Sequence, residues 1–568
     1  MVALETQDLE ERLSHISGAA IRKAGHGHDY YDPMKTPEEG DLEDGGALVE
    51  GGALPLLTRE AFGLYSQYFT IGVLLGGIPQ LAYPVFLNYL NMEGYQVVTY
   101  GVLVNGGWYF KPFFGMLTDC VPLFGYRRKS WMIVGWIVAM ICLAVMAFMS
   151  FEAPFCGKKE LCLVSLKKIP AADQAKYFNF HAPDSGYKFI ITSVFLCLGY
   201  MMAACASDAM VVQYAQREPL AIRGRIQTAI YTVRYVGQTT ALLCIALLLN
   251  GPNYRGSFDF NVSPNVIYGI FLAPCVVVVV TTIFFVVEVK TPPTPFKQWC
   301  VMLWDLLQTR AMWQVATYRL MNNIFYNFSS TAAQPIELIW AKATPLNDSF
   351  SGIIGNVIFM AIMVVVGKYG LLWNWRWTIA LSSIAIILVD GFVIFMTIFD
   401  GLRNQWFFTG AQLADQIPGG IRFIVGTYCA VELADAGNEG SVYGFITALN
   451  NVSSPIATVI YKLIDSYFAI SNLDILRDDS HVRWAVAYTY FIAYGFKLLS
   501  LVWLFLLPRQ KQELQELKRT GSKSPLAAVL IIVAFITCLV FSMTVNILAI
   551  FPSTKCLRVA GGPGCAKK

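Results

Sequence analysis

Long apolar runs separated by short polar stretches form the pattern of this chain of 568 residues. Thirteen of these runs are about 20 residues long or longer, which is the length that a helix needs to cross a bilayer core of roughly 30 Å. The pattern therefore predicts an all-α polytopic membrane protein. The expected segments are 64–90, 95–118, 131–150, 188–215, 226–250, 264–288, 311–340, 350–371, 376–398, 405–432, 439–466, 483–507 and 525–550.

The spacing of the runs gives two groups of six helices and one additional helix. Two six-helix halves joined by a linker are typical of the major facilitator-type fold, so we expect a 6+6 helix bundle with an extra C-terminal helix. The predicted regions are a disordered cytoplasmic tail (1–60), an N-terminal six-helix half (61–288), a cytoplasmic linker (289–310), a C-terminal six-helix half (311–507), a basic cytoplasmic connector (508–524), the additional transmembrane helix (525–550) and a C-terminal tail (551–568).

Charge gives the expected orientation of these helices. Arg127, Arg128 and Lys129 lie between two apolar runs, and Lys and Arg near helix ends stay on the cytoplasmic side of a membrane. We therefore expect a multi-pass protein with a cytoplasmic N-terminus, and the plasma membrane as its location. Composition agrees, because 14% of the residues are charged whereas a soluble domain has about 25%. Membrane lipid is an expected partner, and the net charge of +4 gives no sign of nucleic-acid binding.

Two pairs of cysteines fall in segments expected on the outer side. Cys156 and Cys162 lie in the loop 151–187, and Cys556 and Cys565 lie in the C-terminal tail. Both pairs can form disulfides in an oxidising compartment. Asn347, in an N-D-S sequon of a predicted external loop, is the expected glycosylation site.

Ionisable residues within the apolar runs are functional candidates, because an unpaired charge is costly inside a bilayer. Lys111, Asp208 and Arg234 lie at similar depth in the N-terminal half, so they can form one substrate-binding or coupling cluster with a surplus positive charge. The alternative is a structural ion pair of Asp208 with Arg234. Arg319 and Arg422 are the corresponding candidates of the C-terminal half.

Other charges of the C-terminal half have simpler interpretations. Asp390 is expected to pair with a neighbouring helix, and Glu337 is expected to lie in water near an outer helix end. Lys462, Asp465 and Lys497 are placed near helix ends or can extend their charged groups toward the interface.

Two of the expected helices carry residues that interrupt a helix. Gly76-Gly77-Ile78-Pro79 and Pro84 fall in the first segment, and Gln416-Ile417-Pro418-Gly419-Gly420 falls in the tenth. Freed backbone groups at membrane depth must be buried in protein or line an aqueous cavity. A cavity lining is the functional interpretation, and a kink that serves packing is the alternative.

No enzyme motif is found in the sequence. A G-x-x-x-x-G-K-[ST] phosphate loop, an H-E-x-x-H pair and a G-x-S-x-G nucleophile turn are absent. Five histidines leave little material for a metal centre, so we expect no catalytic residue, no metal and no cofactor.

Three stretches resemble signature regions of the folate–biopterin transporter family of the major facilitator superfamily. They are KPFFGMLTDCVPLFGYRRKSWMIVGW, SDAMVVQYAQREPLAIRGRIQT and NEGSVYGFITALNNVSSPIA. The first matches the family pattern nearly in full, through Lys111, Pro112, Gly115, Asp119, Gly125, Arg127 and Arg128. The second departs from it, because Ala204 and Gln213 stand where the family has Asp and Glu.

The resemblance implies a secondary transporter that moves folate, biopterin or related pteridines by proton-linked or facilitative transport. A flat polar ring joined to a glutamate dianion suits aromatic rings and surplus cations. By the same resemblance Asp119, Gly125, Arg127 and Arg128 form a gating motif, and Asp208 is the candidate for proton coupling. Transport of another small metabolite such as S-adenosylmethionine, or a non-transporting sensor on the same fold, are the alternatives.

Overall fold

The computed structural model describes most of the chain from residue 51 onward. The expectations for the tail before that residue lie outside the described residues. The described residues are 51–565, apart from 159, 163, 165, 218–224, 291–294, 370–372 and 434–438.

The first six expected segments are all helical. The first is divided into α2 (Arg59–Gln80) and the π-helix η2 (Ala82–Tyr89), because Pro84 has no N–H to continue the α-helical ladder. The second is divided by a 3₁₀ turn. The helices are α3 (Gly94–Val104), η3 (Gly106–Phe110), α4 (Lys111–Cys120), α5 (Lys129–Phe148), α8 (Tyr187–Gln216), α9 (Arg225–Leu248) and α10 (Pro264–Phe285), with the short α6 (Ala171–Tyr177) and α7 (Ala182–Ser185) in the loop before α8.

The remaining seven segments are helical as well. A short helix, α11 (Phe296–Leu307), occupies the predicted linker, and α21 (Lys511–Thr520) occupies the predicted connector. The helices between and after them are α12 (Arg310–Tyr326), α13 (Ala333–Ile339), α14 (Pro345–Tyr369), α15 (Trp375–Ile398), α16 (Gln405–Ala414), α17 (Gln416–Leu433), α18 (Glu439–Asp465), α19 (Asn472–Arg477), α20 (Ser480–Leu499), η7 (Ser500–Leu506) and α22 (Pro525–Leu548).

The predicted all-α polytopic membrane fold is confirmed. The described residues contain isolated bridges but no named strand. Eight helical segments among them are long and apolar enough to cross a bilayer. Of the other five expected segments, the eighth and eleventh are the single helices α14 and α18, and the second, seventh and tenth are divided into shorter helices. Helices of membrane proteins are divided where neighbouring helices bury the freed backbone groups.

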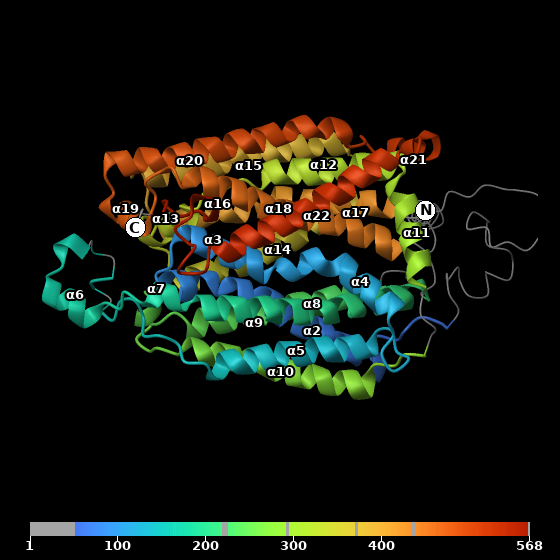
Figure 1. Cartoon of the computed structure of the whole chain (residues 1–568), viewed down its shortest axis with the longest axis horizontal. Coiled ribbons are helices and arrows are strands. Elements are labelled where there is room, and N and C mark those ends of the chain that lie inside the picture. The colour runs from blue at the N-terminus through green and yellow to red at the C-terminus, as the bar shows by residue number, and fades with distance from the viewer. Residues whose placement is uncertain are drawn as a thin grey trace, which may run out of the picture.

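The helices run side by side along the long axis of the molecule (Figure 1). In that view α2, α5, α8, α9 and α10 lie in the lower part, and α12, α15, α17, α18 and α20 lie in the upper part. Helix α22 crosses obliquely in front of α18 toward α3, and the three helices are in contact. The buried apolar residues follow this arrangement. One large cluster is built mostly from residues 54–286, and a second runs from Tyr109 through residues 306–539.

The glycines of the first segment serve helix packing. A Cβ on Gly72 would lie 2.1 Å from the backbone oxygen of Arg234, and a Cβ on Gly237 would lie 2.2 Å from that of Phe69. Gly77 is packed in the same way against the ring of Phe271. The residues of η2 are also all buried. The packing alternative therefore accounts for Gly77 and for the interruption near Pro84. In the tenth segment the helix is interrupted at Asp415, one residue before the Gln416–Gly420 stretch.

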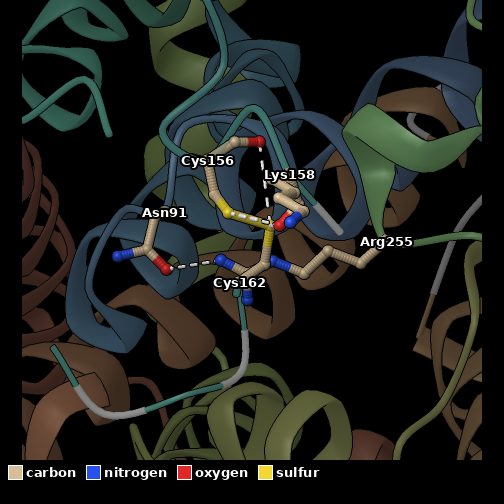
Figure 2. The surroundings of a disulfide bond; sticks show 5 residues. All are labelled: Asn91, Cys156, Lys158, Cys162 and Arg255. Atoms are coloured by element: carbon tan, nitrogen blue, oxygen red, sulfur yellow. Dashed lines mark hydrogen bonds between the residues drawn. A yellow bond between two sulfur atoms is a disulfide. The ribbon is translucent and has the colours of Figure 1, made fainter. Parts of the chain in front are cut away.

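The two predicted disulfides are present, and both lie at the end of the bundle away from Arg127. Cys156 is bonded to Cys162 and Cys556 to Cys565. Figure 2 shows the first disulfide beside Arg255, whose Nη2 donates to Asn91 Oδ1 at 2.9 Å. Burial lowers the pKa of Arg255 to about 10. We call this end of the bundle the disulfide end, and in Figure 1 it carries α7, α13, α19 and the C-terminus.

Several polar residues near the disulfide end are buried where the sequence suggested contact with water. Glu337 is 3% exposed, Lys462 is 0% exposed and Asp465 is 3% exposed, so the expectation of wet or interfacial side chains is wrong for all three. The expected glycosylation site is also wrong for this conformation, because Asn347 is 1% exposed at the start of α14. Apolar runs reveal which helices exist, but not which neighbours cover their ends.

Candidate functional site

Three helices of the first half bring a lysine, an aspartate and a tyrosine into direct contact. Lys111 begins α4, Asp208 lies in the second half of α8, and Tyr68 lies in α2. Lys111 Nζ is 2.6 Å from Asp208 Oδ2, and the Tyr68 hydroxyl donates to Asp208 Oδ1 at 2.6 Å. Both carboxylate oxygens are therefore engaged, and the charges of Lys111 and Asp208 cancel.

The ion pair differs from the alternative considered from the sequence. Asp208 pairs with Lys111, and Arg234 is not its ion-pair partner among the described residues. The 3₁₀ turn η3 just before Lys111 sets the direction in which the lysine leaves α4. Lys111 Nζ also lies 5.3 Å from the centre of the Trp108 ring in that turn, which is within the range of a cation–π contact.

Arg234 supplies the surplus positive charge of this cluster. Its guanidinium carbon lies 5.1 Å from the centre of the Tyr231 ring and 5.9 Å from that of Tyr235. The Tyr231 ring in turn packs edge-on against Tyr68, with ring centres 6.1 Å apart. The Nε of Arg234 is buried and has no hydrogen-bond partner among the described residues. A buried donor without a partner is costly, which makes it a natural contact for an anionic or carbonyl-bearing ligand.

Aromatic side chains around the cluster differ in their exposure to solvent. Tyr231 is 39% exposed, and its ring already contacts Arg234 and the Tyr68 ring. Tyr109 is buried and donates its hydroxyl hydrogen to the carbonyl of Val102 at 3.2 Å. A ring bound at this site is therefore expected beside Tyr231 and Trp108, and not at Tyr109.

Arg422 is the best-defined cation of the second half. It is 8% exposed in α17, and its Nη1 and Nη2 donate to Asn322 Oδ1 at 2.5 Å and to Ser383 Oγ at 2.8 Å. Its guanidinium lies 3.6 Å from the centre of the Tyr326 ring, and the Tyr326 hydroxyl donates to Asp415 Oδ1 at 3.2 Å. These contacts join α12, α15 and α17 around one arginine.

Arg319 lies in the same half, on α12. It is 9% exposed, and its carbonyl accepts from Asn323 Nδ2 at 2.7 Å. Asn323 Nδ2 also donates to Asn450 Oδ1 in α18, at 2.7 Å. The side-chain contacts described for Lys111 and Asp208 lie within the first half, and those described for Arg422 lie within the second. The structure therefore has two separate cation sites, one in each half.

Asp390 confirms the expectation of a partner on a neighbouring helix. Its Oδ2 accepts from the Tyr494 hydroxyl of α20 at 2.7 Å.

Apolar hollows lie away from both cation sites. One of about 390 Å³ is lined by residues of α15 and the turn after it, including Phe392 and Phe395, and one of about 420 Å³ lies between α5 and α10. No charged residue lines either hollow, so they suit lipid chains.

The predicted gating motif begins at Asp119 near the end of α4 and continues through the loop before α5. Gly125 has a φ of +84°, in the left-handed region that favours glycine. Arg128 is buried, and its Nη1 donates to Thr118 Oγ1 at 2.5 Å. The side chain of Asp119 lies outside the described residues, so its part in the gating motif stays a prediction.

Glu288 binds the backbone of this loop, a role that the sequence did not indicate. Its carboxylate accepts from three successive backbone N–H groups, those of Arg127, Arg128 and Lys129, at 3.0, 2.9 and 2.8 Å. These groups form the N-terminus of α5, where a negative charge is stabilising. The available signal was a single acidic residue at the end of the sixth expected segment (264–288), which has no periodicity to mark it.

The fold and the sequence can now be compared with those of known proteins. A D-xylose–proton symporter superposes with a TM-score of 0.52 over 80% of this chain and 99% of its own, at 13% identity. A POT family transporter in complex with 5-aminolevulinic acid superposes with a TM-score of 0.53 over 80% of this chain and 98% of its own, at 9% identity. The chain therefore shares the fold of these two membrane proteins.

Sequence comparison finds one family model and one curated relative that resemble this chain. Residues 72–164 match the model of the BT1 family. A curated folate-biopterin transporter from Synechocystis sp. is 23% identical over 432 residues, which cover 73% of this chain and 76% of that protein. The resemblance to the folate–biopterin transporter family that the three motifs indicated is thereby confirmed.

Proposed function

We propose that this protein is a secondary transporter that moves folate, biopterin or related pteridines across a membrane by alternating access. The observation that carries the proposal is Arg234, a surplus cation with a buried, unpartnered Nε beside the exposed face of Tyr231. A pteridine ring can stack on Tyr231 while a carboxylate or ring carbonyl binds Arg234. The proposed role is transport and not catalysis.

The two cation sites fit a cycle in which the halves rock against each other. The N-terminal half (61–288) would present Lys111, Asp208 and Arg234, and the C-terminal half (311–507) would present Arg319 and Arg422. A dianionic folate can then bridge the two halves, and its binding would favour the closed arrangement. Asp119, Gly125, Arg127 and Arg128 are proposed as the gate at the other end of the bundle.

Asp208 is the proposed proton-coupling group of the central site. A proton on Asp208 would release Lys111 from the ion pair and leave that ammonium free for an anionic substrate. Asp208→Asn should therefore remove any dependence of uptake on a proton gradient while exchange of substrate continues. A gradient dependence that survives this substitution would exclude Asp208 from coupling.

The disulfides and the basic residues support one orientation. Both disulfides lie at the end opposite to the Arg127 loop, and disulfides persist in oxidising compartments. We propose that the disulfide end faces outward, that the N-terminus is cytoplasmic, and that the protein resides in the plasma membrane.

Uptake into proteoliposomes tests the proposal. Labelled folate, biopterin and S-adenosylmethionine are each supplied with and without an inward proton gradient. Saturable uptake of a pteridine, abolished by Arg234→Ala at an unchanged amount of folded protein, is the expected result. Uptake of S-adenosylmethionine alone would move the substrate to a sulfonium compound, and binding without uptake would favour a sensor. Uptake that survives Arg234→Ala would contradict the role given to this arginine.

A further inference from the structure

Lys462 is a fully buried lysine at the point where three helices meet near the disulfide end. It lies in α18 and is 0% exposed. Its Nζ donates to Thr99 Oγ1 of α3 at 2.8 Å and to Asn546 Oδ1 of α22 at 2.8 Å. Among the described residues no carboxylate pairs with it. A buried ammonium without a counter-ion costs several kcal/mol, so the charged form is disfavoured here.

The two partners match the donors of a neutral amine. Thr99 donates its own hydroxyl hydrogen to the carbonyl of Tyr95 at 2.7 Å, so its oxygen can only accept from Lys462. Asn546 Nδ2 donates to the carbonyl of Ser542 at 2.9 Å, which turns its Oδ1 toward the lysine. A neutral amine has two N–H donors and finds two acceptors, whereas an ammonium would bury a third donor. The contacts therefore fit an uncharged Lys462.

The titratable groups around this site are engaged elsewhere. Asp465 Oδ2 accepts from the backbone N–H and the hydroxyl of Thr331 at 2.7 and 3.0 Å, and Glu93 Oε2 accepts from the N–H of Asn472 at 3.0 Å. Asp184 pairs with Lys555. The groups that the packed elements bring to this end are Glu93 and Tyr95 from α3, Tyr461 and Asp465 from α18, Tyr490 from α20, and Lys555 and Arg558 from the C-terminal tail, while α22 has no charged residue.

The lysine contacts belong to a set of hydrogen bonds that close the disulfide end. Gln80 of α2 donates to Asp348 of α14 at 2.5 Å, and the Tyr83 hydroxyl donates to the carbonyl of Ala343 at 2.6 Å. Like the bond from Lys462 to Thr99, these join the N-terminal half (61–288) to the C-terminal half (311–507). Opening this end would separate α3 from α18, break the bond to Thr99 and admit water to Lys462.

We propose that Lys462 is a proton-binding latch of the disulfide end, neutral while this end is closed and protonated when α3 and α18 part. A proton from water adds to the Nζ lone pair on opening and returns to water on closing. The proposal rests on the alternating-access function proposed above. Because one proton is bound only in the open form, the ratio of open to closed molecules should rise by up to tenfold for each pH unit that the pH falls. A lower pH on the side of the disulfide end would thus favour the open form of that end. The bound proton would return to the same side on closing and would not be transported.

Hydrogen exchange of the substrate-free protein tests the latch. Peptides from the start of α3 and the end of α18 are followed by mass spectrometry at about pH 6 and about pH 8, spanning roughly two decades of proton concentration. Rates are divided by those of the unfolded peptides at the same pH, and peptides of α5 serve as an internal reference. We expect these two regions to open more at the lower pH, and we expect Lys462→Met to abolish that difference.

Two further variants serve as a control and as a substitute for Lys462→Met. Lys188→Met removes the same charge from an exposed position at the same end and should keep the pH response. Lys462→Gln retains a neutral donor for Asn546 and replaces the Met variant if that protein does not fold. A wild-type protein without the pH response, or a response that both Lys462 variants retain, would overturn the latch. Because no substrate is added, a Lys462-dependent response stands even if pteridine uptake fails.

Discussion

Two lysines of the described bundle, Lys111 and Lys462, differ in their surroundings, because one is partly buried with a carboxylate partner and the other is fully buried without one. Lys111 lies 2.6 Å from a carboxylate, with side-chain exposures of 13% for the lysine and 30% for Asp208. Lys462 is fully buried against a hydroxyl and an amide oxygen, with no carboxylate partner in the part of the chain that the structure describes. The first environment favours a charged amine and the second favours a neutral one.

The difference separates two tasks that one protein can combine. A paired lysine keeps its charge and can exchange its carboxylate for an anionic substrate. An unpaired lysine at a closing interface changes its charge when that interface opens. The first property suits substrate binding and coupling, and the second suits sensitivity to the pH on one side of the membrane. Substitutions at Lys111 and at Lys462 should therefore have different effects on stability and uptake.

The largest effect is expected at the paired lysine. Lys111→Met leaves the Asp208 carboxylate with only the Tyr68 hydroxyl, and loss of one partner of a buried ion pair costs roughly 3–5 kcal/mol. The partial exposure of Asp208 places this variant toward the low end of that range. We expect a lower melting temperature in detergent and no measurable uptake.

The double variant Lys111→Met/Asp208→Asn serves as the control for this prediction. It removes both charges, so most of the stability should return while uptake stays lost. A double variant as unstable as the sum of the two single variants would show that the pair is not coupled and would contradict the first half of the comparison.

A smaller effect is expected at the unpaired lysine. Asn546→Leu removes one acceptor of Lys462, and a buried neutral donor without a partner costs about 1–3 kcal/mol. Adding Lys462→Met should recover most of that stability, because no donor is then left unsatisfied and Thr99 keeps its bond to Tyr95. The melting temperatures of the two single variants and the double variant measure this coupling. A loss as large as that of Lys111→Met would indicate a charged Lys462 and would remove the contrast.

The sequence predicted the helices well and the partners poorly, for one physical reason. A run of apolar residues long enough to cross a bilayer indicates a helix wherever it occurs, so all thirteen expected segments are helical. Lys111 and Asp208 were likewise recognisable as charges at membrane depth. Their pairing was not, because it depends on the turn η3 before Lys111 and on how α4 and α8 are rotated toward each other.

Lys462 was misjudged because burial is a property of neighbours. It lies close to the C-terminal end of α18, a position from which a lysine usually reaches water. Helix α22 and the start of α3 cover that end, and both are far from Lys462 along the chain. Glu288 shows the same limit, since its role depends on backbone N–H groups that lie in another loop.

The smallest effect is expected for a third arrangement, in which Asp478 lies outside the membrane-spanning segments and pairs with Arg403 and Arg483. Burial favours the neutral form of Asp478, but hydrogen bonds from Arg403 and Arg483 outweigh it and lower the pKa of Asp478 to about 2. This pKa is lower than the value of about 3.9 for an unfolded aspartate, so the stabilisation is complete above about pH 4 and is lost as the pH falls through about 2. Asp478→Asn should therefore lower the melting temperature slightly at neutral pH and leave it unchanged near pH 2. Asp259→Asn, at an exposed position in the loop between α9 and α10, is the matched control and should change neither value. A fall in melting temperature at neutral pH as large as that of Lys111→Met would contradict this expectation. It would mean that solvent does not weaken the contacts of Asp478 with Arg403 and Arg483, so that exposure could not explain why their effect on stability differs from that of the Lys111–Asp208 pair.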